Sequence, residues 1–168
     1  MAMFRDEVIA IKSSSIGERD RIYTLFGKRT GKFKAIAKGV KRIESKKSGH
    51  LQSLNICKIA CAKGKTFDVI TEVESSFELG ARKLSTQQYE LVGYFCFVLD
   101  KFLSEGVREY EVYKLAKTYL IGEISEKRTK LAVYKLLEFL GFVGNKQADL
   151  SYDKLKILVD KILDRAYT

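Results

Sequence analysis

Few residues in this chain could do catalytic chemistry. It has one histidine, His50, and three neighbouring carboxylates, Glu72, Glu74 and Glu78, of the type that a metal-dependent nuclease uses. Two glutamates at positions i and i+2 of a strand more commonly share one solvated face. The sequence contains no zinc-protease, nucleophile-elbow, P-loop or dinucleotide-binding motif. We therefore expect a protein that is not an enzyme.

Three cysteines and the histidine could, by number, form a zinc site. Cys57 and Cys61 are four residues apart among apolar neighbours, and Cys96 lies on an apolar helical stripe. This spacing differs from the short pairs typical of zinc sites, and a buried free cysteine behaves as a small hydrophobic residue. We expect the cysteines to lie in the core and the protein to need no metal or other cofactor.

The chain has an excess of positively charged side chains. Its 168 residues include 31 Lys and Arg and 21 Asp and Glu, a net charge of +10, which favours polyanionic partners. Residues 12–47 contain twelve basic and three acidic residues, whereas residues 81–168 contain 15 basic and 12 acidic residues. This segregation predicts a localised surface that binds anions.

The basic residues are densest in residues 38–50, KGVKRIESKKSGH. Backbone amides and serine hydroxyls in such a loop can donate hydrogen bonds to phosphate, and Lys and Arg neutralise its charge. We predict that this loop and the strands beside it bind nucleic acid. The candidate DNA contacts, of which the first two are secondary, are Arg19, Arg21, Lys34, Lys38, Lys41, Arg42, Lys46 and Lys47.

Five short runs rich in β-branched and aromatic residues predict the strands that position this loop. They span residues 8–11, 21–26, 33–37, 54–62 and 67–73, with turns at 27–32 and 63–65. In residues 32–38 the alternation puts Lys32, Lys34 and Lys38 on one face, opposite Phe33 and Ala35. At most one of Tyr23, Phe26 and Phe33 is expected to stack on bases, because aromatics in a small barrel mostly fill its core.

After about residue 80 the apolar period changes from two to about 3.6, which predicts four helices. The stripes begin at Tyr89, Tyr110, Leu131 and Leu155. Ser125 and Ser151 are expected N-caps, and Gly106, Gly122 and Gly141 are expected helix stops. We predict an α+β protein, with a five-stranded OB-fold barrel at residues 1–80 followed by a helical bundle at residues 81–168.

The chain has no stretch of about 18 uncharged apolar residues and no apolar signal-peptide region near its N-terminus. Its odd number of cysteines fits a reducing compartment. We expect a soluble, cytoplasmic protein that does not bind a membrane.

Four motifs in order resemble the bacterial recombination mediator family RecO. GERDRIYTLF at residues 17–26 is similar to the start of that family, and GKFKAIAKGVKR at 31–42 is similar to its G-x-x-x-x-x-A-K-G-A-R-R. LQSL at 51–54 and KLLEFLGF at 135–142 stand where the family has L-Q-P-F and L-L-x-x-L-G-Y. Where many members have four zinc-binding cysteines, residues 143–149 contain none, so the chain resembles a short form of the family.

The resemblance implies an OB-fold followed by a helical domain, binding of single- and double-stranded DNA, and annealing of complementary strands. It implies RecR as a partner and help in replacing single-strand-binding protein by RecA, in the cytoplasm and at the nucleoid when DNA is bound. Lys130 and Leu140 match the site for the tail of single-strand-binding protein. Two alternatives stay open, a general binder of single-stranded nucleic acid, including RNA, and a basic adaptor for an acidic protein.

Overall fold

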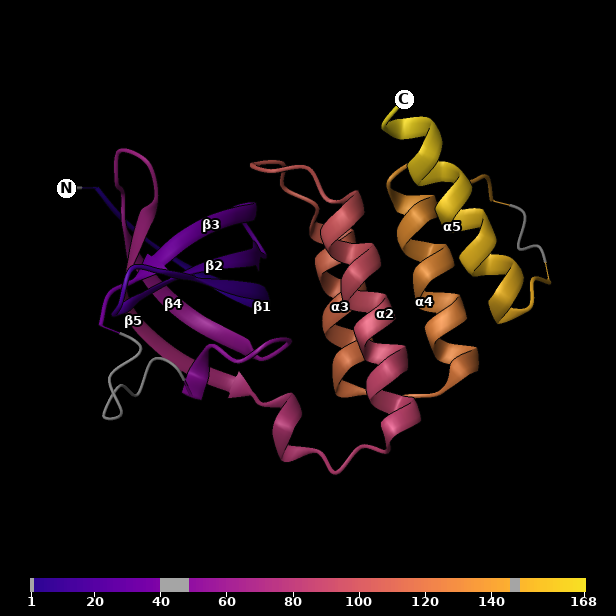
Figure 1. Cartoon of the computed structure of the whole chain (residues 1–168), viewed down its shortest axis with the longest axis horizontal. Coiled ribbons are helices and arrows are strands. Elements are labelled where there is room, and N and C mark those ends of the chain that lie inside the picture. The colour runs from indigo at the N-terminus through magenta and orange to yellow at the C-terminus, as the bar shows by residue number, and fades with distance from the viewer. Residues whose placement is uncertain (1, 40–48, 146–148) are drawn as a thin grey trace. The chain divides into compact units, whose positions relative to one another are not determined.

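The computed structural model describes residues 2–39, 49–145 and 149–168. Its N-terminal strands form a closed barrel in the order β1-β2-β3-β5-β4 (Figure 1). This order and closure are those of the predicted OB-fold. The strands are β1 Met3–Ile16, β2 Asp20–Gly27, β3 Gly31–Ala37, β4 Ile56–Ala62 and β5 Asp68–Phe77.

Strand β1 is much longer than the predicted residues 8–11 because it pairs with two neighbours. Its first half pairs with β4, from Met3 opposite Ala62 to Ile9 opposite Ile56. Its second half pairs with β2, and the register shifts between Ala10 and Lys12. Such an irregularity bends a strand. The barrel closes where β3 and β5 run parallel, with Ala35 opposite Asp68.

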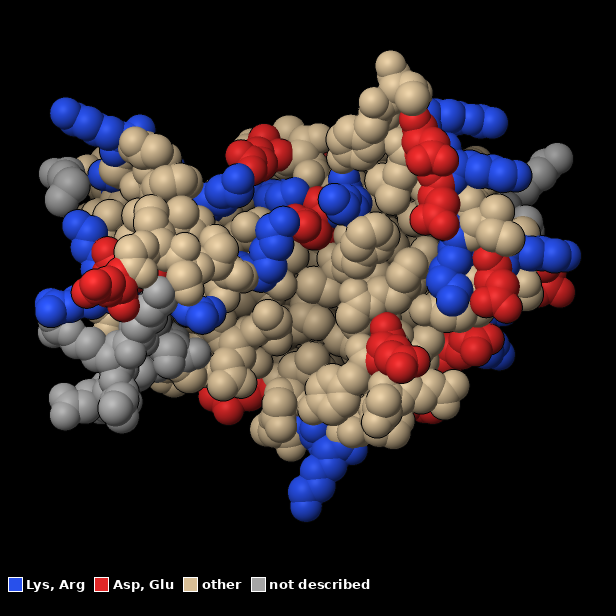
Figure 2. All heavy atoms as spheres, in the orientation of Figure 1, with Lys and Arg blue, Asp and Glu red and all other residues tan. Residues whose placement is uncertain are grey.

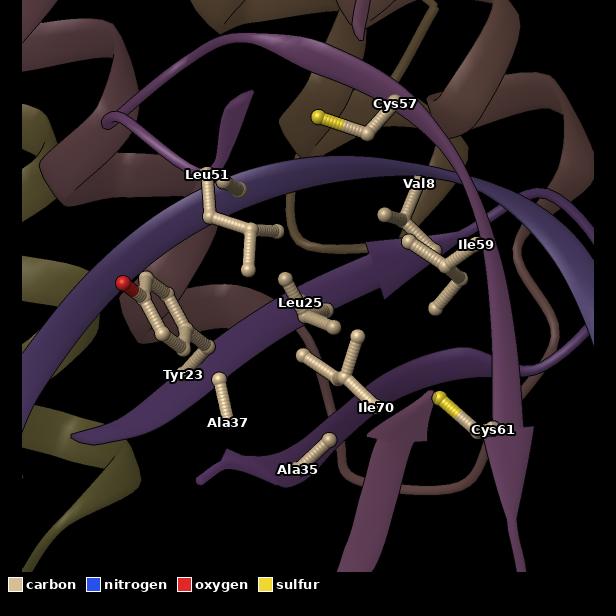
Figure 3. Packing of buried hydrophobic residues seen from close by; sticks show 11 residues of the cluster. Val8, Tyr23, Leu25, Ala35, Ala37, Leu51, Cys57, Ile59, Cys61 and Ile70 are labelled. Carbon is tan, nitrogen blue, oxygen red and sulfur yellow. The ribbon is translucent and has the colours of Figure 1, made fainter. Parts of the chain in front are cut away.

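Alternate side chains of the strands fill the barrel (Figure 3). Leu25, Ile59 and Ile70 point toward one another in its centre, and each is at most 3% exposed. The remaining buried members of this cluster are Val8, Ala10, Tyr23, Ala35, Ala37, Leu51, Cys57 and Cys61. The burial of Ala35, Cys57 and Cys61 is as expected from the sequence.

The segment Leu103–Lys117 belongs to the same compact unit as the barrel, Met1–Lys83. The Phe26 ring meets the Tyr113 ring edge-on at 5.5 Å. Gly31 has a φ of 72°, and a Cβ there would collide with the carbonyl of Val107, so close backbone contact requires glycine. The outer face of β2 and β3 is thus partly covered by this segment.

Glu7 ties the same segment to β1. Its Oε1 accepts hydrogen bonds from Tyr113 Oη and from Lys117 Nζ, both at 2.8 Å. Burial alone would raise the pKa of the Glu7 carboxyl, but these two hydrogen bonds and the charges of Lys117 and Lys28 together outweigh it, and the pKa is lowered.

The predicted turn at residues 27–32 connects β2 and β3, and it is stabilised by the side chain of Asp6. The side chain is 7% exposed. Its carboxylate accepts hydrogen bonds from the backbone amides of Arg29 and Thr30, at 3.0 Å each, and from Thr30 Oγ1 at 2.8 Å. A buried carboxylate is tolerated when its acceptor sites are filled in this way.

The four predicted helices follow. The N-cap predictions and the helix stops at Gly122 and Gly141 are confirmed, but Gly106 lies four residues beyond the end of α2, where its amide donates to the Lys32 carbonyl instead of capping the helix. Ser125 accepts a hydrogen bond from the Arg128 amide at the start of α4, and Ser151 does so from Lys154 at the start of α5. Gly141, with a φ of 82°, ends α4, because the Phe142 amide then reaches the Leu137 carbonyl at 2.8 Å. The helices are α2 Thr86–Phe102, α3 Tyr110–Ile121, α4 Glu126–Phe139 and α5 Tyr152–Ala166.

The predicted stripes of α2 and α4 match the buried face to different extents. The stripe that begins at Tyr89 is largely confirmed, because Val92 and Leu99 are buried, although Tyr89 itself is 45% exposed. In α4 the first residue of the predicted stripe, Leu131, is 46% exposed, and the buried face includes Ala132 and Val133 instead. A helix with apolar residues around most of its circumference does not define its buried face by period alone.

The chain forms two compact units. The second consists of Leu84–Phe102 and Thr118–Thr168, so α3 begins in the first unit and ends in the second. A short helix, η1 Leu79–Ala81, lies just before the point where the chain first passes from one unit to the other. None of the helices in the described ranges combines the length and apolar character needed to span a membrane.

Candidate nucleic-acid interface

One end of the barrel brings together three of the predicted DNA contacts. The Asp20 carboxylate, at the start of β2, accepts a hydrogen bond of 2.8 Å from the backbone amide of Gly39, just after β3. Arg19 and Arg21 flank Asp20 in sequence, and Lys38 precedes Gly39. This hydrogen bond therefore joins the start of β2, where the arginines precede and follow Asp20, to the segment directly after β3 that contains the lysine.

These three cations differ in their own contacts. Arg19 and Lys38 are exposed and form no ion pair within the described residues. Arg21 is half-buried, and its Nη1 donates a 2.9 Å hydrogen bond to Ser13 Oγ on β1. None of the three forms an ion pair with a carboxylate within that part of the chain.

Lys34 lies apart from this group, in the middle of β3. The predicted alternation is confirmed, since Lys34 and Lys38 are exposed whereas Ala35 and Ala37 are buried. Lys34 Nζ lies 3.5 Å from Glu105 Oε1, and both side chains are about half exposed. An exposed pair of this kind contributes little to stability, but it lowers the net charge at Lys34.

Lys41, Arg42, Lys46 and Lys47 lie outside the described residues. Figure 2 shows that, on the face in view, blue side chains project from several separate places and form no continuous field.

The three aromatic rings considered for stacking are packed in the fold. Tyr23 and Phe26 are 3% and 0% exposed. Phe33 packs against the barrel core and meets the Phe4 ring edge-on at 5.8 Å. Burial raises the pKa of Tyr23. Tyr23 and Phe26 therefore present no face to solvent on which a base could stack, and Phe33 is partly buried.

His50 and Cys57 make structural contacts with the barrel. The Ser75 amide donates a 3.1 Å hydrogen bond to His50 Nδ1, and Cys57 Sγ donates one of 3.0 Å to the His50 carbonyl. Burial raises the pKa of the Cys57 thiol to about 12, so the thiol is protonated at neutral pH. In the described part of the chain, no three His, Cys, Asp or Glu side chains group as metal ligands would.

The carboxylates considered for catalysis face solvent, as expected of their more common arrangement. Glu72 pairs with Arg5 at 2.9 Å, and both side chains are exposed. Glu74 lies opposite Lys58 across the strand pair. Glu78 accepts a 2.7 Å hydrogen bond from Ser75 Oγ. Each acid therefore has a different basic or hydroxyl neighbour.

The candidates for the tail site lie on α4. Lys130 lines a groove of about 380 Å³ with Tyr134, Leu150 and Leu155, and its Nζ donates a 3.1 Å hydrogen bond to the Leu150 carbonyl. Leu140 is the half-buried C-cap residue of α4 and is not among the residues that line this groove. Ten residues separate the two, a rise of about 15 Å along a helix.

Sequence reasoning missed three residues that shape this surface. Asp20 was noted only as part of a motif, Glu105 was not considered, and Tyr110 was assigned to an apolar stripe although it is 38% exposed. The acid at position 20 between two arginines was a usable signal, because a short acidic side chain in a turn commonly accepts backbone hydrogen bonds. Nothing in the sequence links position 105 to position 34.

Residues 1–77 match the family model described as "Recombination protein O N terminal". A "DNA repair protein RecO" of Bifidobacterium longum is 30% identical over 126 residues, 74% of this chain and 52% of that protein. Proteins of the same name from Thermobifida fusca and Desulforudis audaxviator are 36% and 27% identical over 48% and 84% of the chain, which correspond to 33% and 58% of those proteins. The chain spans about half the length of the Bifidobacterium longum and Desulforudis audaxviator relatives.

Proposed function

The chain belongs to the RecO family, and on that premise we propose that it is a non-enzymatic DNA-binding protein of recombinational repair. In this proposal it binds single- and double-stranded DNA, anneals complementary strands and assists the loading of RecA. Its partners are RecR and the tail of single-strand-binding protein, with Lys130 and Leu140 as contacts for the tail. Residues 1–80 form the DNA-binding domain and residues 81–168 the helical domain.

The observation that supports DNA binding is the hydrogen bond from Gly39 to Asp20, which groups Arg19, Arg21 and Lys38. In sequence, this group is followed directly by the segment that contains Lys41, Arg42, Lys46 and Lys47. Cations this dense neutralise neighbouring phosphates and release their counterions. Two strands held on one such surface repel each other less, which is the physical basis proposed for annealing.

The salt dependence of oligonucleotide binding tests the proposal. If six phosphates are neutralised, the logarithm of the affinity for single-stranded DNA falls with the logarithm of salt at a slope of about −4. The double variant R19E/K38E should lose much of this slope. The matched variant K154E/K161E, which places the same charge change on exposed positions of α5, should lose little.

An annealing assay with tailed oligonucleotides, with and without single-strand-binding protein, tests the role in repair. Faster annealing of complementary strands, and capture of RecR, support the proposal. Equal binding of matched RNA and DNA without annealing would favour the general single-strand binder. Negligible DNA binding at about 0.15 M salt, with tight binding of an acidic protein, would favour the adaptor.

A further inference from the structure

Tyr110, the first residue of α3, is a partly exposed ring with three cations around it. Lys114 Nζ lies 5.4 Å from the ring centroid, Arg108 Cζ lies 5.6 Å from it, and Lys28 Nζ lies 6.0 Å from it. The cations come from α3 itself, from the segment before it and from the turn between β2 and β3. All four residues belong to the same compact unit.

This convergence distinguishes Tyr110 from the other rings near a cation. Among the described residues, Phe4, Phe97 and Tyr152 each have a single lysine within this range. One cation near an exposed ring gains about 0.5–1 kcal/mol, but three cations around one ring also repel one another. An anionic ligand would relieve that repulsion.

The carboxylates near this cluster neutralise it only in part. Glu111 lies 3.8 Å from Lys114, and both side chains are more than half exposed, so water screens the pair. Glu109 precedes Tyr110 and is partly exposed. Glu7 lies near Lys28, but its carboxylate already accepts hydrogen bonds from Tyr113 and Lys117.

We propose that Tyr110 is a stacking platform for a base of single-stranded DNA, and that Lys28, Arg108 and Lys114 bind the phosphates on either side of that base. The proposal rests on the function proposed above and adds to it a point of base contact. Proteins that bind single strands without reading sequence combine aromatic rings, on which bases stack, with neighbouring cations that bind the phosphates. An acidic peptide would satisfy the cations but would leave the ring face unused.

The hairpin of β2 and β3 connects this cluster to the group around Asp20. Gly27 lies opposite Gly31 at one end of the hairpin, next to Lys28, and Arg21 lies opposite Ala37 at the other. Strand β2 spans eight residues, which is about 24 Å. Single-stranded DNA of roughly 4–16 nucleotides, the length that binds one OB-fold, can span this distance.

The test compares Tyr110→Ala and Tyr110→Phe with wild type, using a fluorescent oligothymidine and a second oligonucleotide that contains 2-aminopurine. Tyr110→Ala should weaken binding by about 5- to 100-fold, the loss expected for one stacked base, and should abolish the quenching of 2-aminopurine. Tyr110→Phe keeps the ring and should behave as wild type. Tyr89→Ala, at a ring of similar exposure on α2, is the matched control.

The same experiment distinguishes the contribution of charge to DNA binding from the contribution of stacking. Tyr110→Ala should leave the salt slope unchanged, whereas Arg108→Gln and Lys114→Gln should each reduce it by about 0.7. Wild-type affinity and quenching in Tyr110→Ala would overturn the stacking proposal while leaving the proposed function intact. If Tyr110→Ala instead lost only the binding of an acidic peptide ending in phenylalanine, the cluster would be a protein-docking site and the proposal would be wrong. Absence of DNA binding by the wild type would overturn the proposed function itself.

Discussion

The Asp20 carboxylate accepts a hydrogen bond from the Gly39 amide across 2.8 Å. This contact links the turn after β1 to the end of β3, two segments separated by nineteen positions in sequence. An acid next to two arginines would, by charge alone, oppose the binding of DNA. Its position indicates that it acts as a positioning residue for the cations around it.

Replacement of Asp20 should therefore weaken DNA binding in spite of the charge that it removes. We expect Asp20→Ala to reduce the affinity for single-stranded DNA by about three- to tenfold, equivalent to the loss of one hydrogen bond of roughly 0.7–1.4 kcal/mol. Asp20→Asn, which retains the acceptor oxygen, should bind at least as tightly as wild type. Fluorescence anisotropy at fixed salt measures both.

Glu18→Ala is the matched control for Asp20, because it removes the same charge from an exposed position of the same turn. It should leave the affinity unchanged or slightly raised. If Asp20→Ala and Glu18→Ala both tightened binding equally, charge alone would explain the effect and a positioning role for Asp20 would be excluded.

Glu105 should restrain DNA binding through its ion pair with Lys34. The two side chains lie 3.5 Å apart and are about half exposed. Glu105→Gln should raise the affinity for single-stranded DNA by about two- to fivefold, the equivalent of an exposed charge interaction of roughly 0.5–1 kcal/mol. Glu90→Gln, at an exposed position of α2, should have no such effect. Equal affinities for wild type and Glu105→Gln would indicate that Lys34 does not contact DNA.

The barrel could be predicted from sequence because its period is local. Alternation at Phe33, Lys34 and Ala35 depends only on the two-residue repeat of a strand, and the structure reproduces it. Ser125 and Ser151 are likewise read from the residues directly beside each helix. These features need no knowledge of what a segment packs against.

The surface could be predicted only in part because tertiary contacts determine which charges are neutralised. Lys34 and Arg21 were both candidates in sequence, Arg21 as a secondary one, yet Lys34 is paired with Glu105 and Arg21 donates to Ser13. Tyr110 has the period of a buried stripe, but the cations around it come from positions as distant as Lys28. Long-range proximity of this kind has no signature in a single sequence.

The turn between β2 and β3 should depend on the hydrogen bond from Thr30 Oγ1 to the buried Asp6 carboxylate, at 2.8 Å. Thr30→Val keeps the shape of the side chain and removes the donor, so we expect the free energy of unfolding to fall by about 1–2 kcal/mol. Chemical denaturation measures the change. Thr66→Val makes the same substitution at an exposed position of the turn between β4 and β5 and should be nearly neutral. A similar loss in both variants would contradict the role assigned to Asp6.

Glu7 should make the stability of the protein depend on acid pH. Its carboxyl has a lowered pKa in the folded state, because the hydrogen bonds from Lys117 and Tyr113 and the charges of Lys117 and Lys28 together outweigh the effect of burial. A group of this kind stabilises the fold above its unfolded pKa, near 4.5, and this contribution is lost as the pH falls through the lower, folded value. The stability difference between wild type and Glu7→Gln should therefore be largest near neutral pH and shrink below about pH 4.5.

Denaturant unfolding of wild type and Glu7→Gln at a series of pH values from neutral to acid measures this difference. Tyr113→Phe removes one of the two donors to Glu7 while it keeps the ring that meets Phe26. It should show a smaller acid-dependent loss than wild type, because the folded pKa of Glu7 then lies closer to the unfolded one. Parallel stability curves for wild type and Glu7→Gln across this range would show that the carboxylate does not gain its hydrogen bonds on folding.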